Sequence, residues 1–599
     1  MSETLSDRIS ACMKRVLKDF EKIRGQSKED GFSIAFWDIV VITAADEEQK
    51  KAYELQLYGK LQRNEIPKGI PYHVYADPPG YKLGSGGSTF TALSELHKIY
   101  NQDLFDKKIL MIHAGGQSQR LPSASVLGKI FSALPLGEPM YQLLELKLAM
   151  YLPVIEKMSP GVLLTSSDTL ELFNDGEESD WAIDKPGFTA FAHPSSLEIG
   201  TGHGVYVLEE PKKMGKKKVE EALCLEVLQK PSVKLMYDKG AVIEKKDTNS
   251  KAEDPYVYSD SMFYFDHTLT QKMLKWYEEN GPIQCEICAY GDFLQPLGPR
   301  ATGEYIHNTS NVSHMEPALL KTREQMFSLL KGTQLNLVVF NESKFYHVGT
   351  THEYIDNLCH SQSFSQELGL SRDAFSHFSQ HNARLAKMPK LESAIAGCVM
   401  HSCLPSQSAV AASAVVEYSH FKIPVKIGAN CIISNCFFDD DQSEELSLDI
   451  PANTFLHTIP MVHNGGTCYA TVVYGTNDNI KKRAADRESA GQITFLGKDL
   501  KRACEFYKLK QPGDLFEKNP KALNLWFCQL FPVVSNMGQS CYFAVQMAKH
   551  MQSSSGDQEL DLSGYPRVSM ADLLETKDVA AMLEYREKLR KVIEKAHHH

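Results

Sequence analysis

Residues 109–129 read Ile-Leu-Met-Ile-His-Ala-Gly-Gly-Gln-Ser-Gln-Arg-Leu-Pro-Ser-Ala-Ser-Val-Leu-Gly-Lys. The apolar run at 109–113 predicts a buried strand, and the glycine pair after it predicts a phosphate-binding loop. Gly115 and Gly116 would let backbone N–H groups approach a phosphate, because no side chain intervenes. Arg120 and Lys129 would then supply cations for a phosphoryl group in transfer. For the glycines alone, a strand-to-helix turn beside two solvated cations is the alternative interpretation.

The first 400 or so residues alternate short apolar runs with helical patterns, which predicts a layered α/β sheet. We expect a helix to begin at Pro139, because apolar residues follow it at helical spacing and proline suits the first turn. Parallel strands in this order place ligands at their carboxyl ends. The clearest predicted strands are residues 39–43, 72–75, 109–113, 162–165 and 335–340.

The pattern changes near residue 400. Apolar residues recur every six positions, at Ala409, Val415, Phe421, Ile427 and Ile433. This spacing is typical of a parallel β-helix, in which each hexapeptide forms one face of a coil. An ordinary run of short strands is the alternative. Beyond about residue 490 the pattern is helical again, and residues 569–595 predict one or two terminal helices.

Size and composition exclude several classes of protein. The 599 residues exceed a single hydrophobic core and suggest roughly three to four folding units. A net charge of −11 spread along the chain argues against a nucleic-acid surface. No apolar run approaches the roughly 20 residues needed to cross a bilayer, so we expect no membrane contact. Thirteen scattered cysteines fit a reducing compartment, and we expect a cytoplasmic protein.

A second glycine loop reads Lys-Leu-Gly-Ser-Gly-Gly-Ser-Thr at 82–89, ahead of a helix expected to start near Phe90. Three glycines and two hydroxyls near a helix N-terminus suit a base or a phosphate. The loop is neither a Walker loop nor a dinucleotide fingerprint, because its lysine precedes the glycines and the spacing differs.

Asp168 follows the predicted strand at 162–165, which puts a carboxylate at a strand's carboxyl end. Such a group can hold Mg²⁺ that bridges substrate phosphates. Equally, Asp168 could cap a helix over residues 169–173. Further along stand Gly-Thr-Gly-His-Gly-Val at 200–205, Leu-Gln-Lys-Pro at 228–231 and Tyr-Ser-Asp-Ser at 258–261. Each fragment alone would more often be a turn, and their order is the informative part.

That order resembles the sugar-1-phosphate nucleotidyltransferases: Ala-Gly-Gly-x-x-x-Arg-x-Pro at 114–122, then Lys129, Asp168, His-Gly-Val at 203–205, Lys-Pro at 230–231 and Phe-Tyr-His-Val-Gly-Thr at 345–350. Within that family, Trp-Asp-Ile-Val-Val-Ile-Thr-Ala-Ala-Asp-Glu at 37–47 and Ala-Tyr-Gly-Asp-Phe-Leu at 289–294 are similar to the members that make GDP-L-fucose. The resemblance implies an α/β, Rossmann-like (GT-A-like) catalytic domain over 1–395, a left-handed β-helix over 396–485 and a mixed, largely helical region over 486–596.

The resemblance also implies roles for single residues. Arg120 would hold the departing phosphates and Lys129 the reacting ones, as the catalytic pair. Nucleotide contacts would come from Gly84, Gly86, Gly87, Ser88, Thr89, Gly115, Gly116, Gln117 and Ser118. The sugar phosphate would meet His203, Gly204, Lys230 and Asp292. Mg²⁺ would bind Asp168 and Asp260, with Glu286 or Asp292 as alternatives to Asp260. Two positions depart from the family: Gly128 replaces a proline, and His347 stands where many relatives have a second metal-binding aspartate.

The reaction so implied joins GTP and β-L-fucose 1-phosphate into GDP-L-fucose and pyrophosphate, with no protein nucleophile. The same chemistry on another pair, such as mannose 1-phosphate with GTP or glucose 1-phosphate with UTP, is the nearest alternative. A non-catalytic sugar-nucleotide sensor is a second. A third is an acyltransferase that uses a histidine of the coil, His420 or His457, although neither has an evident partner in the sequence. The resemblance leaves homo-oligomer formation open.

Overall fold

A computed structural model describes residues 3–176, 180–244, 254–379, 394–439, 447–553 and 560–598. The chain forms two compact units, one from residues 1–116 and 144–347, the other from residues 117–143 and 348–599. The boundaries therefore fall in the glycine loop after Gly116, between Leu143 and Leu144, and after His347. The three domains expected from the sequence stay a prediction. The two units are defined only by how densely their residues contact one another, which does not test those domain boundaries.

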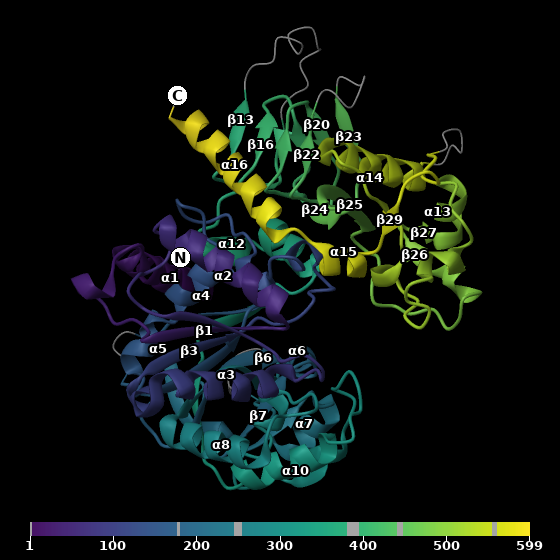
Figure 1. Ribbon diagram of the computed structural model, residues 1–599. Helices are drawn as coiled ribbons and strands as arrows, with labels where there is room; N and C mark the ends of the chain where they lie inside the picture. Colours follow the sequence, from purple (N-terminus) through teal and green to yellow (C-terminus); the bar gives the residue numbers. More distant parts are fainter. Residues whose placement is uncertain are drawn as a thin grey trace. The chain divides into compact units, whose positions relative to one another are not determined.

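In the first unit, four parallel strands lie side by side in the order β2 (Tyr72–Ala76), β1 (Ile39–Ala44), β3 (Lys108–His113) and β4 (Gly161–Ser166). Figure 1 labels β1 and β3, which pair with each other. Each extends the predicted strand by one or two residues. Every residue of β1 is buried, as expected for a central strand with helices on its faces. The helices of this half are α1 (Leu5–Ile23), α2 (Glu47–Gln62), α3 (Gly84–Tyr100), α4 (Leu143–Met150), α5 (Leu152–Lys157) and α8 (His267–Asn280).

The rest of this sheet departs from an open Rossmann-like sheet. Strand β9 (Tyr256–Asp266) runs antiparallel to β4, and beyond it follow β6 (Phe188–Ser196), β10 (Leu335–Phe340), β8 (Val219–Gln229) and β7 (Gly204–Leu208). Strand β7 pairs back onto β9 through Val205 and Ser259, so five strands close into a barrel. The α/β class is confirmed, whereas the Rossmann-like (GT-A-like) arrangement is not, because this half closes into a five-stranded barrel. The same unit also contains helices α6 (Leu197–Gly200), α7 (Val233–Lys239), α9 (Ala289–Asp292) and α10 (Leu319–Leu330).

The helix expected to begin at Pro139 begins instead at Leu143. Residues 134–141 form a loop of their own, in which Leu134 N–H donates to Tyr141 O and Tyr141 N–H donates to Leu136 O. The Tyr141 carbonyl, which in a helix beginning at Pro139 would accept an N–H from the next turn, accepts from Leu134 N–H instead. The preference of Pro139 for the first turn of a helix therefore does not decide where this helix begins, because the hydrogen bonds of the loop hold residues 134–141 in another conformation.

The second unit contains a coil of short parallel strands, here called the coil, over the described residues 373–379, 394–439 and 447–463. Successive strands fall in turn into three parallel sheets: β12, β15, β18, β21 and β24; β13, β16, β19 and β22; β14, β17, β20 and β23. The predicted apolar positions Val415, Phe421, Ile427 and Ile433 lie buried in β18, β19, β20 and β21. Their bounds are β12 (Asp373–Ala374), β13 (His377–Ser379), β14 (Ala394–Ile395), β15 (Cys398–Met400), β16 (Cys403–Pro405), β17 (Ala409–Val410), β18 (Val415–Glu417), β19 (His420–Phe421), β20 (Val425–Ile427), β21 (Ile432–Ser434), β22 (Phe437–Phe438), β23 (Leu448–Ile450) and β24 (Thr454–His463).

Serine side chains join consecutive turns of the coil. The hydroxyls of Ser402, Ser408 and Ser413 each accept a backbone N–H from a residue of the next turn, at Ser419, Val425 and Asn430 respectively. Side-chain acceptors thus satisfy backbone donors at the corners, where strand pairing stops.

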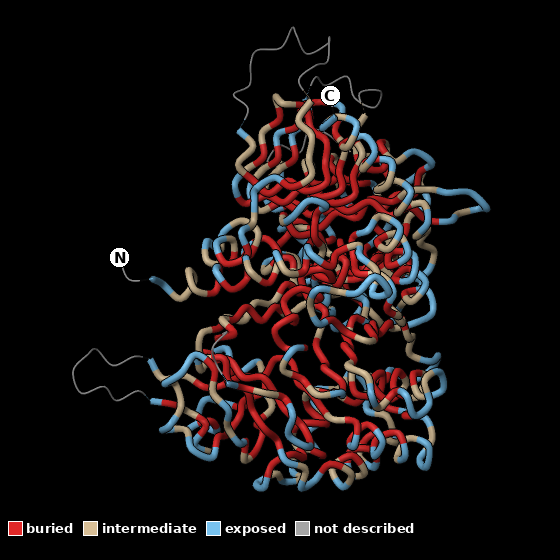
Figure 2. The backbone as a smooth tube through the Cα atoms, turned by 90° about the vertical axis from the view of Figure 1, so that its left-hand side faces the viewer, coloured by how far each residue is buried: buried red, intermediate tan, exposed pale blue. Residues whose placement is uncertain are grey.

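Helices follow the coil, as expected. Ser569 caps α15 (Met570–Thr576) in a capping box with Asp572, and α16 (Val579–His597) follows. Helix α16 packs Leu589 and Ile593 against Cys403 of the coil. Figure 2 shows the buried residues, in red, gathered in the interior, with exposed residues mainly on the outer loops. The second unit also contains α11 (Thr351–Ile355), α12 (Gln362–Leu368), α13 (Leu500–Phe506), α14 (Met537–Gln552) and β25 (Gly466–Gly475).

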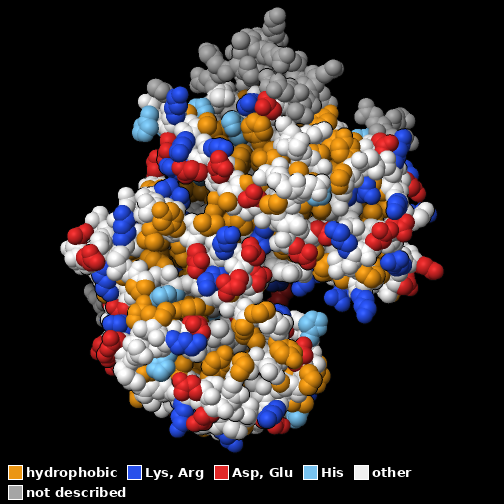
Figure 3. All heavy atoms as spheres, viewed as in Figure 1, with side chains coloured by type: hydrophobic (Ala, Val, Ile, Leu, Met, Phe, Trp, Pro, Cys, Tyr) orange, Lys and Arg blue, Asp and Glu red, His pale blue; other side chains and the backbone are white. Residues whose placement is uncertain are grey.

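The surface carries charges of both signs, and the cysteines form no disulfide bonds. On the face drawn in Figure 3, cationic and anionic side chains are interspersed. All thirteen cysteines are free. Among the described residues, none of the helices combines the length and the apolar character that a membrane span needs.

Candidate active site

A pocket of about 620 Å³ opens at the carboxyl ends of three adjacent parallel strands in the first unit. Its walls are residues that follow β1, residues 77–82 after β2, the start of α3, and Gly115 and Gly116 after β3. Both glycine segments singled out in the sequence therefore line one pocket. This is the edge of a parallel sheet at which ligands bind.

The second glycine segment is the first turn of α3 rather than a loop, since the helix begins at Gly84 and not near Phe90. Gly86 N–H donates to Ile287 O at 2.8 Å, and a Cβ at Gly84 would lie 2.5 Å from that oxygen. Gly84 and Gly86 therefore allow close packing, a role that the sequence did not predict for them. Gly84 and Ser88 line the pocket. Gly87, Ser88 and Thr89 are all buried, and Thr89 Oγ1 bonds His113 Nε2 at 2.9 Å.

Gln49 of α2 holds the first glycine loop. Its Oε1 accepts from Ala45 N–H at 2.8 Å and from Gly116 N–H at 3.3 Å, while its Nε2 donates to Gly116 O at 2.9 Å. A Cβ at Gly115 would lie 3.0 Å from Ala45 N, so glycine fits where the loop passes strand β1. Sequence reasoning missed Gln49. The available signal was its place three residues after Asp46, the N-cap of α2.

The chain passes from the first unit to the second between Gly116 and Gln117. Gln117, Ser118, Arg120 and Lys129 therefore belong to the second unit. Arg120 is exposed, and its carbonyl accepts from Thr351 N–H at 2.8 Å, which ties the loop to the start of α11. Gly128, the departure from the family's proline, has φ +86°, which proline cannot adopt.

Asp168 lies between β4 and β5 (Thr169–Phe173), and His347 ends β11 (Ser343–His347), the partner of β5. Asp168 Oδ2 is 3.3 Å from His347 Nε2. Residues 169–173 form a strand, so the alternative in which Asp168 caps a helix there is wrong. Searched over the described residues, no group of three or more His, Cys, Asp or Glu side chains could hold a metal. One carboxylate still fits Mg²⁺, which takes one or two from protein and further oxygens from substrate phosphates.

A buried polar chain that sequence reasoning missed leads to this loop. Lys147, on α4, donates to Tyr151 Oη at 3.1 Å, and Tyr151 Oη donates to Glu171 Oε2 at 2.7 Å. Glu171 Oε1 accepts from Thr169 Oγ1, next to Asp168. Lys147 and Glu171 are both fully buried, and burial lowers the pKa of Lys147. A lysine inside an apolar helix was the available signal.

The structure brings together His203, Gly204, Lys230 and Asp260. Gly204 N–H donates to Asp260 Oδ1 at 2.9 Å, and Lys230 N–H donates to His203 O at 2.9 Å. A Cβ at residue 204 would lie 2.5 Å from Asp260 Oδ2. Burial raises the pKa of Asp260 to about 6, against the lowering effects of the Gly204 hydrogen bond and of Lys230. Three of the four residues predicted to bind the sugar phosphate are thus neighbours, and Asp260 supports them.

Asp292 is different from the other predicted sugar-phosphate residues. Its side chain is 0% exposed and forms an ion pair with Arg323, whose Nε lies 2.9 Å from Oδ1 without the alignment of a hydrogen bond. Its Oδ2 accepts from Cys288 N–H at 2.7 Å. A carboxylate closed off from solvent cannot meet a sugar phosphate, so we correct its role to a structural one. Glu286, the other alternative metal ligand, pairs with Lys82 at 2.7 Å.

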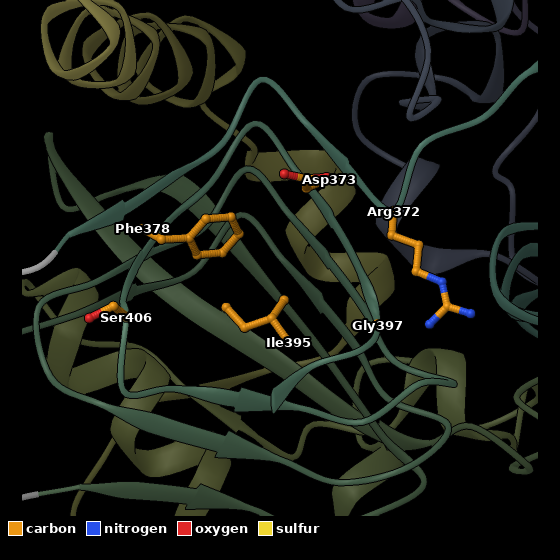
Figure 4. A pocket seen from close by; sticks show the side chains of 6 residues that line it. All are labelled: Arg372, Asp373, Phe378, Ile395, Gly397 and Ser406. Carbon is orange, nitrogen blue, oxygen red and sulfur yellow. The ribbon is translucent and has the colours of Figure 1, made fainter. Parts of the chain in front are cut away.

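A second pocket, of about 320 Å³, lies at the first turn of the coil. Figure 4 shows Phe378 and Ile395 pointing into the coil, whereas Arg372 points away from them. Arg372 Nη1 donates to Ala396 O at 2.6 Å. The lining combines two apolar side chains with the polar or charged Arg372, Asp373 and Ser406. None of the predicted site residues belongs to it.

Comparison with known proteins places the chain in a family. Residues 101–536 match the family model of the fucose pyrophosphorylase domain. The chain is 42% identical over 587 residues to the human protein named fucose-1-phosphate guanylyltransferase, covering 96% of this chain and 93% of that protein. The mouse protein of the same name is also 42% identical, with 96% and 95% covered. A Bacteroides fragilis protein named L-fucokinase/L-fucose-1-P guanylyltransferase is 24% identical over 77% of this chain and 42% of its own length. The chain therefore belongs to the fucose pyrophosphorylase family.

Proposed function

We propose that this chain transfers the GMP group of GTP to L-fucose 1-phosphate, forming GDP-L-fucose and pyrophosphate. The observation that carries the proposal is the 42% identity to the human fucose-1-phosphate guanylyltransferase across nearly the whole of both chains. The pocket supports it independently, since two glycine segments meet at the carboxyl edge of a parallel sheet.

In the reaction, an oxygen of the sugar phosphate attacks the α-phosphorus of GTP in line, and the bond from that phosphorus to the departing pyrophosphate oxygen breaks. No side chain forms a covalent bond. The protein's task is to hold two anions in position and to neutralise their charge. Arg120 would neutralise the departing phosphates and Lys129 the reacting ones. Gly115 and Gly116 would let the nucleotide approach the backbone beside β1.

Gly204, His203 and Lys230 would bind the sugar phosphate, with Asp260 holding the Gly204 backbone in place through the 2.9 Å hydrogen bond. Asp168 would hold Mg²⁺, with Asp260 as the second proposed carboxylate. Bound there, the ion would screen the negative charge of the phosphates. The buried chain from Lys147 through Glu171 would fix the Asp168 loop.

Three finer features also belong to the proposal. The coil is a left-handed parallel β-helix, as its three parallel sheets and six-residue pattern favour. The protein works in the cytoplasm, since thirteen free cysteines suit a reducing compartment. The chain forms a homo-oligomer, since β-helices often pair subunits. The acyltransferase alternative is disfavoured, because burial lowers the pKa of both histidines, to about 4 for His420 and to about 3 for the fully buried His457.

The test is a matrix of the four nucleoside triphosphates against fucose, mannose, glucose and galactose 1-phosphates, with Mg²⁺ present and pyrophosphate release as the readout. Preference for GTP with L-fucose 1-phosphate supports the proposal. Preference for another pair keeps the reaction class and rejects the substrate. Tight binding of GDP-L-fucose without any release would identify a sensor.

A further inference from the structure

A carboxylate that the proposed reaction does not use lies in the wall of the 620 Å³ pocket. Asp77 follows the last residue of β2, and its N–H donates to Ala44 O of β1 at 2.9 Å. Its Oδ1 accepts from Ser88 Oγ of α3 at 2.6 Å. Backbone pairing on one side and a hydroxyl on the other thus fix the carboxyl group in the pocket wall.

The other acids around this pocket are engaged or solvated. Asp46 Oδ1 caps α2 by accepting from Gln49 N–H at 2.7 Å, Glu47 and Glu48 are exposed, and the nearby Glu286 pairs with Lys82. Within the described part of the chain, the recorded side-chain partner of Asp77 is the neutral hydroxyl of Ser88, and no cation pairs with it. Burial raises the pKa of Asp77 to about 6, so the group is mostly ionised at neutral pH. An ionised carboxylate held without a cation in a pocket favours a ligand that offers hydrogen-bond donors.

We infer that Asp77 selects guanine, by accepting hydrogen bonds from N1–H and from the 2-amino group of the base. The inference rests on the proposed function, since it takes GTP as the nucleotide. Guanine presents these two donors side by side, which matches the two oxygens of one carboxylate. Adenine and cytosine present a ring acceptor at the corresponding position, and uracil flanks its single N–H with two carbonyl oxygens that a carboxylate repels.

The position of the two glycine segments fits this role. Asp77 and Ser88 lie at β2 and α3, whereas Gly115 and Gly116 close the same pocket after β3. The base would lie against the β2 and α3 side and the phosphates toward the glycine pair. Tyr81, 47% exposed in the same wall, offers an aromatic face to the base.

The first test uses the unmodified protein with ITP, which keeps N1–H and lacks the 2-amino group. Loss of one charged hydrogen bond predicts a kcat/KM at least about tenfold below that of GTP. Equal values for GTP and ITP would overturn the inference. Absence of turnover with GTP itself would count against the proposed function instead, so the two failures are distinguishable.

The second test is Asp77→Asn with XTP, whose base has a carbonyl in place of the 2-amino group. The amide can donate to that carbonyl and accept from N1–H. We expect kcat/KM for GTP to fall about 100-fold or more and XTP to become the better substrate. Glu54→Gln, an exposed acid-to-amide change on α2, should keep the GTP preference. A folded Asp77→Asn protein that still prefers GTP over XTP would overturn the inference. If that variant does not fold, the ITP comparison decides.

Discussion

Asp292→Asn separates a structural role from a substrate-binding one. The change removes the charge opposite Arg323, and both side chains are almost completely buried, at 0% and 1% exposure. Breaking a buried ion pair by removing one partner costs about 3–5 kcal/mol. Here the guanidinium keeps three oxygens, Ile306 O at 3.3 Å, Asn308 O at 2.8 Å and Asn311 Oδ1 at 2.8 Å. The asparagine oxygen can still accept from Cys288 N–H. The expected loss is therefore at the lower end, about 3 kcal/mol in free energy of unfolding.

Urea unfolding followed by tryptophan fluorescence measures this loss, because Trp37, Trp181 and Trp276 all lie in the first unit. Glu324→Gln is the matched control, an exposed neighbour of Arg323 on α10 that should change stability by less than about 0.5 kcal/mol. In native conditions, Asp292→Asn should keep the KM for the sugar phosphate within about twofold of the unmodified protein. A stability loss below about 1 kcal/mol together with a tenfold higher KM would refute the reasoning and return Asp292 to the substrate site.

Three further predictions concern the site. Arg120→Ala and Lys129→Ala should each lower kcat by about 100-fold or more with an unchanged circular dichroism spectrum, and near-normal turnover would remove that residue from the mechanism. Asp168→Asn should raise the Mg²⁺ concentration needed for half-maximal activity or abolish activity, and an identical Mg²⁺ titration would contradict the metal role. The raised pKa of Asp77, about 6, means that its burial costs stability above that pH, and this cost disappears as the pH falls toward 4. Asp77→Asn should therefore be more stable than the unmodified protein at pH 7.5, by at most about 3 kcal/mol in free energy of unfolding. Near pH 4 the two proteins should be equally stable. Thermal melts that show no difference at pH 7.5 would contradict this prediction.

The parallel half of the first sheet could be predicted because its strands are short apolar runs that follow one another with helices between them. The antiparallel half could not. Strand β9 lies between β4 and β6, and β7 closes the barrel through Val205 and Ser259, which are far apart in the sequence. No local pattern encodes such a pairing. The six-residue apolar period of the coil, in contrast, is local, and its positions fall into successive strands.

The sequence predicted the parts of the candidate site that are built from glycines, and it did not predict the side chains that hold those glycines in place. Gly115 and Gly116, a glycine pair directly after a predicted strand, indicated a binding site at this position. Gln49, which holds their loop, reads as a surface residue of a helix, and Asp77 reads as a turn residue before two prolines. Asp292 looked functional because acids in a motif often are, yet its burial against Arg323 depends on a residue 31 positions away. The pairing of Asp292 with Arg323 leaves no trace in sequence spacing.

The central claim is that the GMP group of GTP moves to L-fucose 1-phosphate, and the fate of the phosphorus atoms tests it most directly. The purified chain would be incubated with Mg²⁺, L-fucose 1-phosphate and GTP labelled with ³²P at either the α or the γ position. We predict that the α label appears in a product with the mass of GDP-L-fucose and that the γ label appears in pyrophosphate. An α label that stays in GTP, or a γ label that leaves as inorganic phosphate before any inorganic pyrophosphatase is added, would contradict the account.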